Sequence, residues 1–525
     1  MNILAQYIKT QNLTAFPSVN SVPAKHINFK TPYSSAKTSI FYINDIHGQV
    51  PKMQRLVSAA EHADLDAQNN GADILKLSSG DTFIGSDDKR NHVAASFLNL
   101  AGIDAQALGN HEFDITASIC GNLLKNSHSK ILGANLNFPD NNSELSKKVM
   151  RSTIIEGKNG EKYGLIGIQP TDLHTRIKKK EGLEGITVDD KEETLKEIKT
   201  EVDKLKGQGL NKIILLSHAG NEFEKEIAQS IDGIDVILGG HSHDLIEGVT
   251  PGENLFYSPS GEPVVITQAG RDGNYYGVLN LEFNDKGQIT YIQNNVNDTN
   301  IYSPNIIMTK EADKILGESP VIGNLKDSDP IPKDNLIEEN PWADFVSDAL
   351  RTRLDADICL INSANFRGSV DKGRITERDI TSIFPFNNTL YKVKLDEEDL
   401  VDAIKKVAKS YAADNHKPGI LQVSGLSYTI DKNGNLLELI FTDKNNQKHP
   451  IDINNPDEDK VYTAIYDEFL INGGDDMDML AKDEDDEDEI IEKYDFDKDK
   501  VTIDYIKSLN QPFEVRKDNR IKVVG

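Results

Sequence analysis

Five short apolar runs in the first half of the chain each end in a cluster of small or polar residues. They read SIFYIND, ADILKLSSGD, IDAQALGNHE, KIILLSH and IDVILGGHSH. Short apolar runs bounded by turn residues are typical of buried strands. Helical patterns lie between them, such as the apolar spacing of Met53, Leu56, Val57 and Ala60. Alternating strands and helices predict an α/β layered domain.

Side chains that can bind metal ions follow each of these runs. Ligands collect beyond the carboxyl ends of strands in layered α/β sheets, so five loops could bring the side chains to one point. Imidazole and carboxylate ligands without thiolate suit divalent Mn, Zn, Fe or Co, and two such ions can clamp a phosphoryl transfer. The candidate metal ligands are Asp45, His47, Asp81, Asn110, His218, His241 and His243.

Each piece of this pattern also has an ordinary structural interpretation. Asp45-x-His47 alone is typical of a surface loop, and His218 alone is typical of a hydrogen-bonded core histidine. Gly-Asn-His-Glu and Gly-Gly-His-Ser-His are more specific, because glycine beside clustered donors has little structural use. Five such elements in order, each after a predicted strand, favour a dinuclear metal site.

Together the motifs resemble the full signature of the calcineurin-like metallophosphoesterases, and the second half resembles the C-terminal substrate domain of the 5'-nucleotidase family. The similarity covers roughly residues 38 to 525. It implies an α/β fold: a four-layer αββα sandwich followed by a smaller α/β substrate-binding domain. It implies a catalytic pair, His111 and Asp114. It also implies one metal ion held by Asp45, His47, Asp81 and His243, and another held by Asp81, Asn110, His218 and His241.

Changes of pattern divide the chain into segments. Residues 1–36, rich in Ser, Asn, Thr and Pro, predict a loosely ordered leader, and residues 37–302 the metallophosphoesterase domain. A helical stretch predicts a linker helix within 303–320. Residues 321–525 have apolar pattern for a second core. Within them, residues 482–500 hold eleven acidic and four basic residues and predict a solvated acidic insertion.

Three segments of the second domain resemble the nucleotide pocket of the family. They are Asn362-Ser-Ala-Asn-Phe-Arg, Phe384-Pro-Phe-Asn-Asn-Thr and Phe469-Leu-Ile-Asn-Gly-Gly-Asp. By that resemblance two phenylalanines sandwich the base, an aspartate holds ribose hydroxyls and an arginine offers a planar fork to phosphate. A phenylalanine beside proline is otherwise most often core packing. The candidate substrate-binding residues are Asn362, Arg367, Phe386, Phe469 and Asp475.

Two departures from the family pattern bear on the substrate. Ser363, Ala364 and Asn365 replace glycines, and we expect their side chains to limit how closely a ligand approaches the backbone. The stretch Lys333–Asn340 carries none of the arginines that family members commonly have there, which predicts one missing phosphate or carboxylate contact.

Composition excludes several classes of partner. The 525 residues carry a formal net charge of −27, which repels phosphate backbones, so no nucleic-acid polymer is expected. No apolar run is long enough to span a membrane. Cys120 and Cys359 lie outside any metal-binding or disulfide spacing. We read no secretory signal in MNILAQYIKTQNLTAF and expect a cytoplasmic protein by default, with a periplasmic or extracellular location as the alternative from the resemblance.

The resemblance implies a phosphohydrolase with two divalent metal ions that releases phosphate from nucleoside 5'-monophosphates. A 2',3'-cyclic-nucleotide 2'-phosphodiesterase/3'-nucleotidase or a UDP-sugar hydrolase stays open, because the loop before Arg367 is altered. A non-catalytic nucleotide-binding protein is the alternative from another class, and the intact His111 and Asp114 argue against it. The expected partner is a small nucleotide, and no oligomeric state is predicted.

Overall fold

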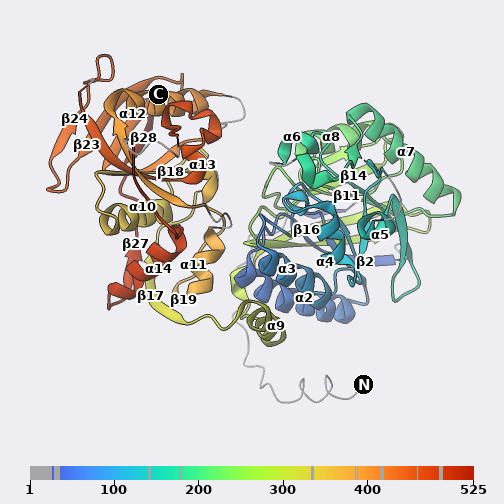
Figure 1. Cartoon of the computed structure of the whole chain (residues 1–525). Helices are drawn as coiled ribbons and strands as arrows, with labels where there is room; N and C mark the ends of the chain where they lie inside the picture. Colours follow the sequence, from blue (N-terminus) through green and yellow to red (C-terminus); the bar gives the residue numbers. More distant parts are fainter. Residues whose placement is uncertain are drawn as a thin grey trace.

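Strand β2 (Ala36–Ile43), predicted from SIFYIND, shows how the first lobe is layered. Its Ile40 and Tyr42 pack into a core between two sheets, whereas Phe41 and Ile43 pack beneath helices on the other face. The structure is a computed structural model that describes residues 26–28, 36–139, 143–177, 180–332, 336–384, 386, 388–413, 419–457, 459–483 and 489–525. Two lobes follow one another along the chain (Figure 1).

An eight-stranded sheet contains β2 in the order β1-β16-β15-β2-β3-β4-β5-β7. Helices α2 (Val50–Asn70), α3 (Asp88–Leu100) and α4 (Ala117–Leu124) cover its outer face. The other strands are β1 (His26–Asn28), β16 (Ile289–Asp298), β15 (Tyr275–Phe283), β3 (Asp73–Ser78), β4 (Ala105–Ala107), β5 (Lys130–Leu132) and β7 (Val149–Met150).

A six-stranded sheet, β13-β14-β12-β11-β9-β8, packs against the first sheet. Helices α7 (Lys191–Gly207) and α8 (Asn221–Ser230) cover its outer face, so the lobe has the predicted order αββα. The strands are β13 (Leu255–Tyr257), β14 (Pro263–Thr267), β12 (Val236–Leu238), β11 (Ile213–Ser217), β9 (Lys162–Ile168) and β8 (Ser152–Glu156). Smaller elements are β6 (Leu136–Asn137), β10 (Thr187–Val188), α5 (Glu144–Lys148) and α6 (Leu173–Arg176).

The second lobe is a smaller α/β unit built on the five-stranded sheet β21-β18-β25-β20-β26. Helix α12 (Glu397–Ala412) packs on one face, and α10 (Pro341–Arg353) and α14 (Lys498–Ser508) pack on the other. The strands are β21 (Leu421–Ser424), β18 (Ile358–Asn362), β25 (Val461–Asp467), β20 (Leu390–Asp396) and β26 (Ile490–Lys493). This architecture confirms the expected fold class.

Two further sheets complete the lobe, in the orders β24-β23-β22-β28 and β19-β17-β27. The predicted hairpin LSYTI/LLELIF is the antiparallel pair β22 and β23. The strands are β24 (Lys448–Pro450), β23 (Leu436–Thr442), β22 (Leu426–Asp431), β28 (Ile521–Val524), β19 (Gly373–Thr376), β17 (Val321–Ser328) and β27 (Phe513–Val515), and the remaining helices are α11 (Glu377–Ile383) and α13 (Glu468–Ile471).

The helix predicted between the lobes is α9 (Ile306–Leu316), and Gly317 caps its C-terminus. Its Met308 and Ala312 are buried in the core beneath α2 and α3, so the helix packs onto the first lobe. Of the predicted leader, His26–Asn28 form the edge strand β1, which pairs with β16. The rest of the leader, before β2 begins at Ala36, lies outside the described residues.

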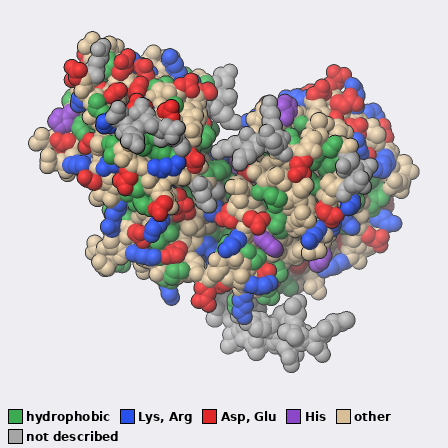
Figure 2. Space-filling model, viewed as in Figure 1, with side chains coloured by type: hydrophobic (Ala, Val, Ile, Leu, Met, Phe, Trp, Pro, Cys, Tyr) green, Lys and Arg blue, Asp and Glu red, His purple; other side chains and the backbone are tan. Residues whose placement is uncertain are grey.

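The prediction of a solvated insertion over residues 482–500 is wrong for its C-terminal half. Strand β26 pairs with β20, and the first residue of α14, Lys498, is buried with its Nζ 2.7 Å from Asp467 Oδ2. The acidic residues are used locally, because Asp497 caps α14 and accepts a hydrogen bond from Lys500 N at 3.4 Å. Residues 484–488 lie outside the described residues. Elsewhere on the face in Figure 2, acidic and basic side chains are interspersed.

Polar contacts join the lobes where α11 lies beside α2 (Figure 1). Gln49 Nε2 donates to Ser382 O at 2.7 Å, and Arg90 Nη2 donates to Thr381 O at 2.8 Å. Lys52 Nζ lies 3.1 Å from Asp371 Oδ1. The described part of the chain contains no helix long and apolar enough to cross a membrane.

Candidate dinuclear metal centre

The carboxyl ends of five strands bring the predicted metal ligands together. Strands β2, β3 and β4 are parallel neighbours in one sheet, and β11 and β12 are parallel neighbours in the other. The loops that leave these strands meet at one edge of the sandwich. Loop by loop, they carry Asp45 and His47, then Asp81, then Asn110, then His218, then His241 and His243.

Asp45 and Asp81 lie at the centre of this cluster. His47 Nε2 is 3.7 Å from Asp45 Oδ1 and 3.5 Å from Asp81 Oδ2. His218 Nε2 is 3.8 Å from Asp45 Oδ1 and 3.0 Å from Asp81 Oδ2. Each imidazole therefore faces both carboxylates, an arrangement in which a carboxylate could bridge two cations.

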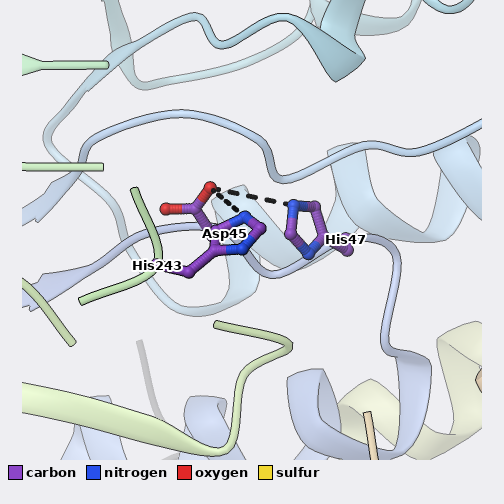
Figure 3. A group of neighbouring side chains, drawn as sticks. All are labelled: Asp45, His47 and His243. Carbon is purple, nitrogen blue, oxygen red and sulfur yellow. Dashed lines mark ion pairs between the residues drawn. The ribbon is translucent and has the colours of Figure 1, made fainter. Parts of the chain in front are cut away.

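Histidines of the loop after β12 extend the cluster on both sides. His243 Nε2 lies 3.3 Å from Asp45 Oδ1, and His47 approaches the same oxygen (Figure 3). His241 offers a ligand atom within 4.8 Å of those of Asp81 and His218. These are two adjoining donor groups, one around Asp45 and one around Asp81.

The donor set fits divalent cations. His47 Nε2, His218 Nε2 and Asn110 Oδ1 are buried and, among the described residues, have no hydrogen-bond partner. Burial alone would lower the pKa of His47, but Asp272 and Asp81 raise it to about 9; that of His218 rises to about 10 because Asp81 and Asp45 outweigh burial. In the absence of metal, His47 and His218 therefore bind protons more readily, and these positive charges offset the carboxylates. Bound cations could do the same.

The ligand loops hold unusual backbone conformations. Asp45, His47, Asp81, His241 and His243 all have positive φ, between 50° and 73°. Such conformations cost about 1–3 kcal/mol each for residues other than glycine and occur preferentially at functional sites. Hydrogen bonds between the loops hold them, including Asp45 N to Gly80 O at 3.0 Å and His47 N to Asp81 O at 2.9 Å.

The predicted catalytic pair lies beside the cluster. His111 Nδ1 is 2.6 Å from Asp114 Oδ2, and Gly85 N also donates to that oxygen at 2.7 Å. Burial alone would raise the pKa of Asp114, but His111 and the amide of Gly85 lower it, so Asp114 is ionised. His111 Nδ1 therefore donates the hydrogen bond, which leaves Nε2 free to hold or transfer a proton. A ligand atom of His111 lies within 4.8 Å of those of His47 and Asp81.

Two positioning residues were not predicted from the sequence. Asp272, in the loop after β14, lies with Oδ1 2.9 Å from His47 Nδ1. Glu112 accepts hydrogen bonds from four backbone amides, of Asp81, Thr82, Phe83 and Gly109, at 2.6 to 3.0 Å. The run VVITQAGRD contains the same sequence signal as the other loops, an apolar strand followed by small and polar residues. Asp272 could have been found by extending the pattern to it.

Three of the predicted substrate-binding residues are close together in the second lobe. Asn362 Nδ2 donates to Asp475 Oδ2 at 3.1 Å. A Cβ added to Gly474 would lie 2.7 Å from Phe469 Cε1, so the ring of Phe469 packs directly on this glycine. Phe386 is half-buried in the loop that precedes β20. A hydrogen bond from Glu468 N to Thr389 O, at 2.7 Å, connects this loop to the segment that carries Phe469. Neighbouring positions 385 and 387 lie outside the described residues.

The three residues that replace the family glycines before Arg367 do not all point toward a ligand, contrary to our expectation. Ser363 Oγ donates to Ile420 O at 2.7 Å, and Asn365 Nδ2 donates to Asp467 Oδ2 at 3.0 Å. Both side chains are buried, so they stabilise the loop from within, and Ala364 is the partly exposed member of the three. Of the arginine-free stretch, residues 333–335 lie outside the described residues.

Two family models match the chain in the order of its lobes. Calcineurin-like phosphoesterase matches residues 38–245, and 5'-nucleotidase, C-terminal domain, matches residues 321–482. The chain combines a calcineurin-like phosphoesterase domain with a 5'-nucleotidase C-terminal domain. It is therefore a metal-dependent phosphoesterase, a hydrolase, and the family as a whole uses divalent metal ions.

Individual 5'-nucleotidases and related proteins agree with this assignment. The 5'-nucleotidase of Rattus norvegicus is 26% identical over 508 residues, which cover 86% of this chain and 85% of that protein. The trifunctional nucleotide phosphoesterase protein YfkN of Bacillus subtilis is 25% identical over 83% of this chain and 32% of its own length. A 5'-nucleotidase precursor from Thermus thermophilus has the same fold, with a TM-score of 0.67, 22% identity and coverage of 93% of this chain and 99% of that one.

Proposed function

We propose that this chain is a 5'-nucleotidase that uses two divalent metal ions to release phosphate from nucleoside 5'-monophosphates. The observation that carries the proposal is the convergence of paired carboxylates and imidazoles around Asp45 and Asp81, with the His111–Asp114 pair beside them. Residues 37–302 would supply the chemistry and residues 321–525 the substrate pocket.

The two donor groups would hold the two ions. The imidazoles of His47 and His218 each lie within 4 Å of both carboxylates. This arrangement favours two ions that share a ligand. Mn, Zn, Fe or Co suits this mixture of imidazole, carboxylate and amide oxygen. When bound, such ions supply hydroxide near neutral pH and neutralise charge on the phosphoryl group. The proposed ligands are Asp45, His47, Asp81 and His243 for one ion, and Asp81, Asn110, His218 and His241 for the other.

His111 is the proposed proton donor to the leaving oxygen of the substrate. Asp114 fixes its ring through Nδ1, so the proton that can move sits on Nε2. Proton transfer from a positioned side chain contributes about 10²- to 10⁴-fold in rate. The short sequence separation, with His111 opening a single 3₁₀ turn that Asp114 caps, keeps the pair rigid.

The second lobe would bind the nucleoside. Phe386 and Phe469 would stack on the base, an interaction worth about 1–3 kcal/mol per base. Asp475, oriented by Asn362, would accept hydrogen bonds from ribose hydroxyls. Arg367 would offer its planar guanidinium to phosphate. The second lobe would thus hold the nucleoside and contact the phosphate through Arg367, while the first lobe would carry out the hydrolysis.

Phosphate release from AMP tests the proposal. The full chain, stripped by chelation and reloaded with Mn or Zn, should hydrolyse AMP, and renewed chelation should abolish the activity. Asn110→Ala removes one proposed ligand and should lower kcat/KM at least about 100-fold. The matched control is Asn126→Ala, an exposed position that should leave kcat/KM unchanged. A reloaded chain that binds AMP but releases no phosphate, in both wild type and Asn110→Ala, would instead indicate a non-catalytic nucleotide-binding protein.

A second candidate lies within the same chemistry. The loop before Arg367 departs from the family glycines, and the relative YfkN is described as a trifunctional nucleotide phosphoesterase. A 2',3'-cyclic-nucleotide 2'-phosphodiesterase/3'-nucleotidase, or a UDP-sugar hydrolase, is therefore the alternative. Preference for a 2',3'-cyclic nucleotide, a 3'-nucleotide or a UDP-sugar over AMP would favour it.

A further inference from the structure

Arg271 lies beside the metal centre without being one of its candidate ligands. It follows β14, and its Nε is 3.5 Å from Asp272 Oδ2. The other oxygen of Asp272 contacts His47. The side chain of Arg271 is only 17% exposed.

The loop that carries Arg367 in the second lobe packs against the loop that carries Arg271. Ser369 Oγ donates to Asn274 Oδ1 at 3.1 Å, three residues from Arg271. A Cβ added to Gly368 would meet Gln49 Oε1 at 2.8 Å, so the backbone next to Arg367 is pressed against the first lobe. Arg271 and Arg367 thus lie in loops that meet at the boundary between the lobes.

No carboxylate of the described residues forms an ion pair with the guanidinium of Arg367. Its Nε is buried and has no hydrogen-bond partner among the described residues, and no ion pair of Arg367 is found within 4.0 Å in that part of the chain. Burial lowers the pKa of Arg367 and Arg271 lowers it further, whereas the carboxylates of Asp272, Asp81 and Asp114 raise it. Arg271 and Arg367 thus lie in loops that pack against each other, and the buried Nε of Arg367 without a partner favours binding of an anion there.

We propose that Arg271 and Arg367 form a guanidinium pair that binds the non-bridging oxygens of the substrate phosphate. The inference rests on the proposed function and specifies its substrate class. A phosphomonoester carries nearly two negative charges above pH 7, whereas a phosphodiester carries one. Two guanidinium groups therefore favour monoesters, such as nucleoside 5'-monophosphates, over 2',3'-cyclic diesters. Arg271 supplies a contact that the arginine-free stretch Lys333–Asn340 does not.

The decisive experiment compares Arg271→Ala, Arg271→Gln and Arg271→Lys in the Mn-loaded full chain. We expect Arg271→Ala and Arg271→Gln to raise KM for AMP and Ki for inorganic phosphate about 10- to 100-fold. The kcat/KM for 2',3'-cyclic AMP should stay within about fivefold. Arg271→Lys keeps the charge but loses the planar fork, so its KM for AMP and its Ki for inorganic phosphate should lie between those of wild type and Arg271→Ala. Arg374→Ala, an exposed arginine on β19, is the matched control.

Two results would overturn the proposal. One is an equal effect of Arg271→Ala on monoester and diester, because a general loss of the site would not depend on substrate charge. The other result is that Arg271→Ala binds less metal and that excess Mn restores both the metal content and the wild-type KM for AMP. Arg271 would then act only through Asp272 and His47. Inorganic phosphate and p-nitrophenyl phosphate test the pair without a nucleoside. A chain that is not a 5'-nucleotidase would still show the loss of phosphate affinity.

Discussion

His47 and Asp272 are joined through Nδ1 and Oδ1 at 2.9 Å, which leaves His47 Nε2 directed at Asp45 and Asp81. A carboxylate behind a ligand histidine fixes the ring orientation and raises the basicity of the ligand nitrogen. His218 is held in the same manner by Ser79, whose carbonyl oxygen lies 2.6 Å from its Nδ1. Both imidazoles that face the paired carboxylates are thus oriented before any cation binds.

Removal of this support should weaken metal binding. We expect Asp272→Ala to lower the affinity for Mn or Zn about 10- to 100-fold, because His47 loses its orienting partner. Asp272→Asn keeps a hydrogen-bond acceptor but no charge, so its metal affinity should lie between those of wild type and Asp272→Ala. Metal titration of the chelated protein measures the effect, with the exposed turn variant Asp285→Ala as control. Identical affinities for wild type and Asp272→Ala would contradict the role of this contact.

Asp114→Asn should impair turnover without loss of metal. The hydrogen bond to His111 Nδ1 fixes the tautomer, and a neutral amide no longer stabilises a protonated ring. We expect kcat for AMP to fall about 10²- to 10⁴-fold at unchanged metal content. Steady-state kinetics and metal analysis of the same samples provide the measurement, and Asp88→Asn, exposed on α3, is the control. Recovery of kcat on addition of excess metal would argue against this role.

Gly109→Ala should destroy the site by steric overlap. A Cβ at this position would lie 2.1 Å from Asp81 Oδ1 and 2.7 Å from His218 Nε2. Both ligands would have to move, so we expect loss of stoichiometric metal binding and of phosphate release. Gly207→Ala is the matched control, since a Cβ at the end of α7 meets nothing within 4 Å. Full activity of Gly109→Ala would show that the ligand positions are wrong.

Stability of the metal-free protein should fall with rising pH because of Glu224. Burial beneath Gly239 raises the pKa of this carboxyl to about 8. A folded-state pKa above the unfolded value gives stability that is fully present at low pH and lost as pH rises through about 8. The loss between pH 6 and pH 8 should be on the order of 2 kcal/mol.

Glu224→Gln removes this titration, and denaturant unfolding at several pH values measures it. We expect the unfolding free energy of the variant to change less between pH 6 and pH 8 than that of wild type. Glu222→Gln is the control, because Glu222 lies two residues earlier on α8 and its side chain is 89% exposed. Parallel pH profiles for wild type and Glu224→Gln would refute the assignment.

The ligand loops could be predicted because the signal is local. A buried strand that ends in Gly-Asp or Gly-Asn-His-Glu is read from adjacent residues, and parallel strands place their ends together. Contacts between distant segments have no such signal. The pairing of Asp272 with His47, and the burial of Asn365 against Asp467, depend on which loops the fold brings together.

The acidic segment shows how composition can mislead. Net charge over residues 482–500 indicated a solvated loop, yet Ile490 packs against the core of the second lobe and β26 extends its sheet. Lys482 lies 3.1 Å from Glu489 and 3.5 Å from Asp399. Charge counted along the sequence does not reveal which carboxylates find a cation or a helix N-terminus in the fold.

The most direct test of a 5'-nucleotidase is the set of kcat/KM values of the Mn-reloaded full chain for AMP, 3'-AMP, 2',3'-cyclic AMP and a UDP-sugar. We expect chelator-sensitive phosphate release with kcat/KM highest for AMP, by at least about tenfold, because the guanidinium pair and the nucleoside pocket both favour a 5'-monoester. A higher kcat/KM for any of the other three substrates, or no phosphate release from AMP, would contradict the proposed function.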